Sequence, residues 1–292
     1  MRRAAVIGGA GDMGRWVARH FSRMGYNVVI SDVRRDDVRK VAEELQVDVA
    51  VDNVEAVRKA DITILCVPPE TVPDVVDEIL SHLKPGSTLV EISSVKTGLT
   101  DCLRKALRAG VRALSVHPLF GPGAPSPRGF RVALIPLQDP KVEREEAERI
   151  FPGAEIVETT LEEHEEAMSY TLALNYIINT ALALTLRDVD LNRLRRLSGP
   201  TFTAQLNLSE AITRTSPKVS ASIIARNMYT QQTVSKYIEN LKKLAEAIKK
   251  ENTDELKRMM EESKLILSKD REYQESYRKL YKMLDAGNSQ SL

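Results

Sequence analysis

Three glycines and the start of a helix near the N-terminus have the spacing of a dinucleotide-binding loop. An apolar run leads into residues 9–14, GAGDMG, which fit the pattern G-x-G-x-x-G. Gly9 would permit a tight turn, Gly11 would let a pyrophosphate approach the backbone, and Gly14 would let the helix pack close to the strand. The helix would begin near Asp12 and Met13, where free N–H groups and a positive partial charge suit phosphate.

An acidic residue follows at the distance that a ribose requires. A second apolar run, residues 28–30, ends at Asp32, about 20 residues after the glycine loop. A carboxylate there can accept hydrogen bonds from both ribose hydroxyls and would repel a 2′-phosphate, which favours NAD. Arg34 and Arg35 come next and could hold that phosphate, so NADP stays possible. The plainer alternative is a glycine-rich turn that binds no nucleotide.

His117 is the strongest candidate for a catalytic group. It follows the apolar run 111–116 and begins a turn rich in proline and glycine. A histidine there could take the proton of a hydroxyl while hydride leaves the same carbon, although it could also only cap a loop. Ser94 could hydrogen-bond the imidazole or a substrate hydroxyl, or cap the next helix. Lys96 could bind an anion or be exposed.

The elements that must position these residues alternate between strand and helix up to about residue 160. Strands are expected near residues 4–8, 28–30, 47–50, 62–67, 88–92, 111–116, 130–135 and 155–157, and helices lie between most of them. This alternation predicts an α/β domain over residues 1–160, with a doubly wound parallel Rossmann sheet. Ligands bind beyond the carboxyl ends of the strands in such sheets, which is where Pro68, Ser93 and His117 would lie.

The remaining residues predict a second domain, 161–292, that is entirely helical. Helices are expected at 164–186, about 190–213, 217–248 and 253–285, with Pro200 and Pro217 marking breaks or starts. The stretch 173–184 carries so few charges that the helix should be buried on several sides, in a bundle or a subunit interface.

Composition excludes several classes of protein. The net charge of +1 over 292 residues gives no reason to expect a nucleic-acid partner. Only Cys66 and Cys102 are present, so a disulfide framework is not expected, and this fits the cytoplasm. No signal peptide precedes the first strand, no apolar run reaches the ~20 residues of a membrane span, and no cluster predicts a metal site. His20 and His82 are expected at the surface, and His164 in an acid-rich helix start with a structural role.

Five stretches of the chain together resemble the prephenate dehydrogenase family. They are residues 8–15 (GGAGDMGR), 93–96 (SSVK), 117–122 (HPLFGP), 163–170 (EHEEAMSY) and 198–202 (SGPTF). The resemblance implies a Rossmann domain and a helical dimerisation domain, with the active site between them in a homodimer. It implies NAD-dependent oxidative decarboxylation of prephenate to 4-hydroxyphenylpyruvate in tyrosine synthesis. His117 would accept the proton of the C4 hydroxyl, Ser94 would orient His117, and the nicotinamide would lie near Val67, Pro68 and Ser93.

Two positions depart from the family pattern and bear on the substrate. Tyr176 stands where many members carry a histidine, and Thr203 stands where many carry an arginine for a substrate carboxylate. Arg214, Arg226 or a group from a partner subunit could replace that cation. The substrate-binding candidates are therefore Lys96, Tyr176, Thr203, Arg214 and Arg226.

Other functions remain open at this point. Arogenate, the amino analogue of prephenate, is an alternative substrate, and a non-catalytic NAD(P)-binding sensor is an alternative function. A β-hydroxyacid dehydrogenase would need a catalytic lysine on the first interdomain helix, and residues 164–186 contain no lysine. A deazaflavin-dependent reductase has a similar glycine loop but lacks the long helical tail.

Overall fold

The computed structural model describes residues 2–288, which divide into two compact units. The first contains the chain up to Met168 together with Ala225–Met228, and the second contains Ser169–Ile224 and the chain from Tyr229 onward. The division therefore falls after Met168 rather than after residue 160. The short segment 225–228 also returns to the first unit, which no local feature of the sequence predicted.

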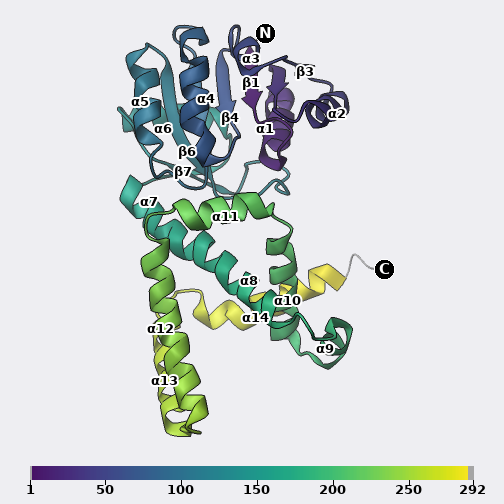
Figure 1. Cartoon of the computed structure of the whole chain (residues 1–292), viewed down its shortest axis with the longest axis vertical. Coiled ribbons are helices and arrows are strands. Elements are labelled where there is room, and N and C mark those ends of the chain that lie inside the picture. The colour runs from purple at the N-terminus through teal and green to yellow at the C-terminus, as the bar shows by residue number, and fades with distance from the viewer. Residues whose placement is uncertain (1, 289–292) are drawn as a thin grey trace. The chain divides into compact units, whose positions relative to one another are not determined.

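The first unit is built on an eight-stranded sheet with the strand order β3-β2-β1-β4-β5-β6-β7-β8 (Figure 1). The strands are β1 (Arg3–Ile7), β2 (Asn27–Ser31), β3 (Asp48–Val49), β4 (Ile62–Leu65), β5 (Thr88–Glu91), β6 (Arg112–Pro118), β7 (Arg131–Leu134) and β8 (Glu155–Glu158). Every strand lies within about two residues of its predicted place. The predicted α/β, doubly wound sheet is confirmed.

One pair of strands departs from the predicted parallel arrangement. β6 and β7 run antiparallel, with His117 opposite Ala133, whereas the other neighbouring strands are parallel. A parallel neighbour needs a crossover connection, usually a helix. Residues 119–130 between these two strands contain no helix, so the chain turns back beside β6.

Helices cover both faces of this sheet, and each face has its own apolar core. α1 (Asp12–Arg23), α2 (Arg35–Leu45) and α6 (Pro140–Ile150) pack in one core with Ala4 and Val6 of β1. α3 (Asn53–Val57), α4 (Val72–Ile79) and α5 (Thr100–Arg108) pack in the other with Ala5 and Ile7. Alternate residues of β1 thus enter opposite cores, which explains why its apolar run is continuous. α7 (Leu161–Met168) is the last helix before the second unit.

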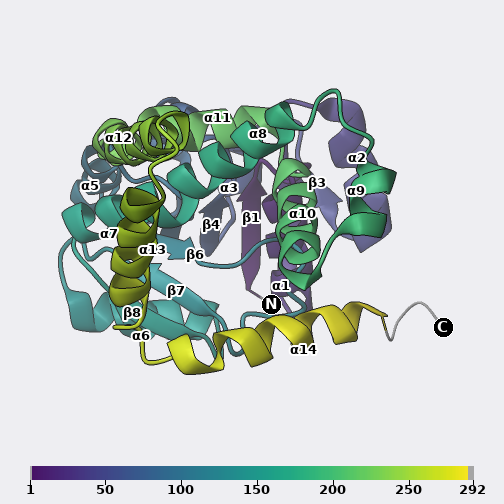
Figure 2. The ribbon, with the colours of Figure 1, turned by 90° about the horizontal axis from the view of Figure 1, so that it is seen from below.

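The second unit is helical, as predicted, but the expected long helices are interrupted. A π-helical segment (Ser169–Leu174) leads into α8 (Asn175–Thr185), and the helices that follow are α9 (Leu191–Leu197), α10 (Pro200–Thr213), α11 (Pro217–Arg226), α12 (Thr230–Lys249), α13 (Thr253–Leu267) and α14 (Ser276–Asn288). Pro200 begins α10 because a missing N–H costs nothing at the first helical position. The predicted helices 217–248 and 253–285 are also each broken in two. α12 and α13 follow one another in the chain and contact each other, and Figure 2 shows α12 nearly end-on (Figures 1 and 2).

Two further findings concern residues 2–288 as a whole. None of the helices in this range is long and apolar enough to cross a membrane. The same residues contain no group of three or more His, Cys, Asp or Glu side chains placed to hold a metal ion. Cys66 and Cys102 are both free thiols.

Candidate active site

The glycine loop between β1 and α1 is too tight for larger side chains at most of its positions. Gly8 has φ +84°, and a Cβ built on it would lie 2.4 Å from the carbonyl oxygen of Cys66. A Cβ on Gly9 would lie 2.6 Å from Cβ of Ile30, and one on Gly14 only 2.1 Å from the oxygen of Gly8. α1 can therefore begin against the end of β1 only because these residues are glycines.

The outer side of the same loop is open and can accept an anion. A Cβ on Gly11 would meet no protein atom nearer than 3.4 Å. Gly11 is also the N-cap residue of α1, and no side chain caps the helix there. The N–H groups of the first helical turn, at Asp12, Met13 and Gly14, have no intrahelical partner in an α-helix. These residues fit the predicted pyrophosphate site.

Asp32 is held beside the glycine loop by hydrogen bonds. Its Oδ2 accepts from the backbone N–H of Ala10 at 3.0 Å, and its Oδ1 accepts from Nε of Arg34 at 3.2 Å. The hydrogen bond to Asp32 raises the pKa of Arg34 above its ordinary value. Arg34 thus partly neutralises the carboxylate that is predicted to bind ribose, while Arg35 is exposed.

The strand ends place the other predicted residues along one edge of the sheet. A single register row crosses β1, β4, β5 and β6 at Ile7, Leu65, Glu91 and Ser115. Two residues beyond this row come Gly9, Val67, Ser93 and His117. The hydroxyl of Ser93 is buried and has no hydrogen-bond partner among the described residues. Because such a group is costly to leave unpaired, its place at this edge fits a site where a bound ligand completes the hydrogen bonding.

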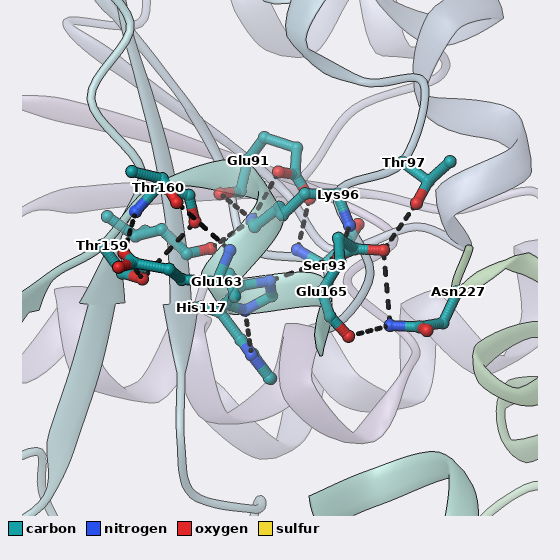
Figure 3. A network of polar contacts seen from close by, with 12 residues as sticks. Glu91, Ser93, Lys96, Thr97, His117, Thr159, Thr160, Glu163, Glu165 and Asn227 are labelled. Atoms are coloured by element: carbon teal, nitrogen blue, oxygen red, sulfur yellow. Dashed lines mark hydrogen bonds and ion pairs between the residues drawn. The ribbon is translucent and has the colours of Figure 1, made fainter. Parts of the chain in front are cut away.

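Lys96 and Glu91 form a buried ion pair next to this edge of the sheet (Figure 3). Lys96 Nζ donates to Glu91 Oε2 and to the carbonyl oxygen of Val116, each at 2.6 Å. The side chains of Lys96 and Glu91 are 1% and 0% exposed. Lys96 is therefore not placed to bind substrate, contrary to the sequence-based prediction. Its ammonium group instead fixes the backbone immediately before His117.

His117 contacts a second buried histidine, which in turn contacts a buried carboxylate. His117 Nδ1 lies 3.1 Å from His164 Nε2, and His164 Nδ1 lies 3.2 Å from Glu165 Oε1. Ser94 was predicted to orient His117, but no hydrogen bond joins the two within residues 2–288, and His164 takes that place. Ser94 is half-buried two residues before Lys96 and stays a prediction as a ligand of the substrate hydroxyl.

The carboxylate of Glu165 is surrounded by donors (Figure 3). It accepts from the backbone N–H of Lys96 at 2.7 Å and from Oγ1 of Thr97 at 2.5 Å. Asn227, from the segment that returns to this unit, donates to the backbone oxygen of Glu165 at 2.7 Å. Burial opposes ionisation of Glu165, but the hydrogen bonds from His164, Thr97 and the Lys96 amide outweigh it and lower its pKa.

The same surroundings keep His117 neutral. Burial, followed by the neighbouring His164 and Lys96, lowers the pKa of His117 well below its ordinary value. Desolvation and a nearby cation both disfavour the imidazolium form. A neutral imidazole at a strand end can accept a proton, as a general base must.

Sequence analysis missed His164, Glu165 and Asn227 as parts of this site. The acid-rich start of α7 is in part structural, since Thr160 and Glu163 form a reciprocal capping box. His164 and Glu165, however, are buried and contact His117 and the Lys96 amide. The only signal was the motif EHEE in the family resemblance. His20 was also misplaced: it is buried against the carbonyl oxygen of Ile150, whereas His82 is exposed as predicted.

Most of the remaining substrate-binding candidates belong to the helical unit. Tyr176 is half-buried on α8, Thr203 donates to the carbonyl oxygen of Gly199 on α10, and Arg214 is exposed at the end of α10. Arg226 belongs to the first unit, where its Nε lies 3.6 Å from Glu70 Oε2. All four remain predictions as ligands of a substrate.

Comparison with known proteins places both parts of the chain in one family. The nucleotide-binding domain of prephenate dehydrogenase matches residues 17–140, and its dimerization domain matches residues 160–262. The chain is also 30% identical over 232 residues to the 4-amino-4-deoxyprephenate dehydrogenase of Streptomyces pristinaespiralis, covering 77% of each protein. The chain belongs to the prephenate dehydrogenase family. The resemblance seen in the sequence is thereby confirmed.

Other members of the family differ in their named substrates. The probable arogenate/prephenate dehydrogenase of Methanocaldococcus jannaschii is 26% identical over 266 residues, which cover 89% of this chain but 59% of that protein. The chain thus spans little more than half the length of that relative. The fold matches a prephenate dehydrogenase crystal structure from A. aeolicus, solved with hydroxyphenyl propionate and NAD+, at a TM-score of 0.73 and 19% identity over 92% of this chain and 98% of that one.

Proposed function

We propose that this chain is an NAD-dependent dehydrogenase that converts prephenate to 4-hydroxyphenylpyruvate with loss of CO2, as a step of tyrosine synthesis. The observation that carries the proposal is the position of His117. It stands two residues beyond the register row that also leads into the glycine loop, and it is buried and held neutral. Membership of the prephenate dehydrogenase family supports this choice of reaction.

The residues of the first unit can perform the protein's part of this reaction. When bound, NAD+ supplies the acceptor for the hydride that leaves C4 of the substrate. His117 takes the proton of the C4 hydroxyl, so that the C–O bond can become a carbonyl. Ser94 would bind the same hydroxyl from the neighbouring strand end. The bond to the ring carboxylate then breaks with release of CO2, and its electron pair completes the aromatic ring as the C4 carbonyl becomes a phenolate oxygen. That oxygen takes back the proton held by His117 to give the phenol.

The residues that would hold the cofactor fit a nucleotide on structural grounds. The open Gly11 and the uncapped start of α1 suit a pyrophosphate, Asp32 suits a ribose, and the unpaired hydroxyl of Ser93 suits a polar group at the reactive end. The complete set consists of Gly9, Gly11, Asp12, Met13, Gly14, Asp32, Val67, Pro68 and Ser93. NAD is favoured because Asp32 lies where a 2′-phosphate would meet a carboxylate, although Arg34 beside it keeps NADP as an alternative.

Arogenate is a second candidate substrate, and one contact favours it. Arg226 and Glu70 form an ion pair in the first unit, and Glu70 directly follows Pro68 and Pro69 beyond β4. A cation beside a carboxylate complements the ammonium and carboxylate groups of an α-amino acid. Prephenate has a keto group where arogenate has the ammonium, so it would use only the arginine.

The test is formation of reduced nicotinamide by the purified chain with prephenate or arogenate, each with NAD+ or NADP+. Turnover with prephenate and NAD+ is the expected result. In His117→Asn, we expect turnover to fall by about 10²–10⁴-fold while NAD+ binding is retained. Measurable NAD+ binding without turnover of any pair would contradict the proposal and favour a sensor.

We further propose that the chain acts as a homodimer in the cytoplasm. The match of residues 160–262 to a dimerization domain supports the dimer. The free thiols of Cys66 and Cys102 are consistent with a reducing compartment.

A further inference from the structure

We propose that Glu165, acting through His164, fixes the tautomer of His117 so that its Nε2 carries the lone pair that accepts the substrate proton. Glu165 and His164 are then positioning residues of the reaction. This inference rests on the proposed role of His117 as the base, but its test includes a measurement on the resting protein.

The direction of the hydrogen bonds starts at Glu165. An ionised carboxylate can only accept hydrogen bonds. Glu165 is ionised because it receives the Lys96 amide, the Thr97 hydroxyl and Asn227 Nδ2, the last at 3.4 Å. His164 Nδ1, at 3.2 Å from Glu165 Oε1, must therefore carry a hydrogen and donate it.

The same reasoning then fixes the second histidine. A neutral imidazole has one donor and one acceptor nitrogen, so His164 Nε2 is an acceptor when Nδ1 is protonated. His117 Nδ1, at 3.1 Å, must then be the donor, and the remaining nitrogen of His117, Nε2, holds the lone pair. The reverse order of hydrogens would place two acceptors, His164 Nδ1 and Glu165, against each other.

The charges near His117 favour its neutral form. Among the described residues, the charged side chains of this hydrogen-bonded network are Glu91, Lys96 and Glu165, all buried. Lys96 is paired with Glu91 and lies close enough to disfavour a charged His117, whereas Glu165 accepts from His164. When His117 gains a proton from the substrate, its Nδ1–H can donate a stronger hydrogen bond to His164. The carboxylate of Glu165, on the other side of His164, then stabilises the added positive charge.

The sharpest test compares Glu165→Gln with Glu165→Leu. In Glu165→Gln the amide oxygen can take the place of Oε1, which accepts from both the Lys96 amide and His164 Nδ1, while the amide nitrogen faces the hydroxyl of Thr97. Glu165→Leu removes the acceptor that holds the hydrogen on His164 Nδ1. We expect ¹⁵N NMR of the resting protein to show His117 protonated at Nδ1 in the wild type and in Glu165→Gln, and a mixture of both tautomers in Glu165→Leu. Turnover should fall by about 10²-fold or more in Glu165→Leu, toward the loss seen without a general base or its correct tautomer, and by less in Glu165→Gln.

Two further variants separate positioning from folding. Glu162→Leu makes the same change at an exposed position of the same helix and should leave both the tautomer and turnover unchanged. His164→Gln can offer its amide oxygen to His117 while its nitrogen turns toward Glu165, and it should retain at least about tenfold more activity than His164→Phe. Should Glu165→Leu fail to fold, the two His164 variants still test the proposal.

The outcomes distinguish this inference from the proposed function. If NMR finds His117 protonated at Nε2 in the wild type, or protonated only at Nδ1 in a folded Glu165→Leu, Glu165 does not control the tautomer, even in an active enzyme. Equal activity of His164→Gln and His164→Phe would also overturn it. If the tautomers change as expected but no substrate is turned over, Glu165 does control the tautomer of His117 and the proposed function fails.

Discussion

The site depends on a few ionisable residues whose charge states are set by burial. His117 is buried, and desolvation followed by His164 and Lys96 lowers its pKa well below 6.5. A base must be neutral to act, so activity should persist at pH values where an exposed histidine is already protonated. We expect kcat/KM to remain constant as the pH falls through 6.5 and to decline only at a more acidic pH, with the slope of one proton. An acidic limb centred above pH 6.5 would contradict the assignment.

The same pKa shift has a consequence for stability. Because the folded state disfavours protonated His117, the unfolded chain binds this proton at a higher pH than the folded chain does. The contribution of neutral His117 is complete above about pH 6.5 and is lost as the pH falls toward the lower folded-state pKa. Urea denaturation from pH 8 to pH 5 should show a decreasing free energy of unfolding, and His117→Asn should show a weaker decrease.

The buried ion pair of Lys96 and Glu91 should matter for stability more than any surface pair. Lys96→Met would leave the Glu91 carboxylate uncompensated at 0% exposure, and we expect a loss of about 3–5 kcal/mol in the free energy of unfolding. Lys105→Met breaks the exposed pair with Asp77, of 44% and 55% exposure, and should cost at most about 1 kcal/mol. Denaturant titration measures both.

A double variant tests the cause of that loss. Adding Glu91→Gln to Lys96→Met removes the uncompensated charge and should recover part of the stability. If Lys96→Met alone costs no more stability than Lys105→Met, the buried pair does not contribute more than a surface pair and the prediction is wrong.

At the scale of elements, the junction of β1 and α1 contains one glycine needed for helix packing and another needed for nucleotide binding. Gly14→Ala would place Cβ 2.1 Å from the backbone oxygen of Gly8, so α1 must move and both stability and NAD+ affinity should fall. Gly11→Ala makes only an ordinary contact at 3.4 Å, so stability should be kept while NAD+ affinity falls at least about tenfold. Thermal unfolding and calorimetric titration distinguish the two, and equal losses of stability would contradict this division of roles.

The elements that sequence analysis predicted well are those specified by local pattern. Strand ends, the glycine loop and the start of α10 at Pro200 each follow from a few adjacent residues. The break between α11 and α12 does not, because Asn227 leaves the helix to bond Glu165, which lies 62 residues earlier in the chain. The pairing of His117 with His164, 47 residues apart, is equally non-local. Spacing therefore identified His117 but gave it the wrong partner.

At the scale of the whole molecule, the apolar helices of the second unit indicate a partner. α8 contains no charged residue, yet Asn179 is its only buried residue in the single chain. α10 contacts α8, and it buries only Leu206 and Ser209 among its residues. The sequence predicts that α8 is buried on several sides, but one chain leaves most of it exposed. We therefore assign the missing contacts to a second copy of the chain.

This assignment predicts a homodimer that specific acidic substitutions dissociate. Leu184 on α8 and Leu208 on α10 are 58% and 45% exposed, and burying a carboxylate in their place without a partner would be costly. We expect light scattering to give twice the chain mass of 32.6 kDa for the wild type and a monomer for Leu184→Glu with Leu208→Glu. Val142→Glu, at a 53% exposed position of α6, is the matched control and should remain dimeric. A wild-type protein that is monomeric at micromolar concentration would refute the dimer. It would also leave the exposure of these apolar helices unexplained.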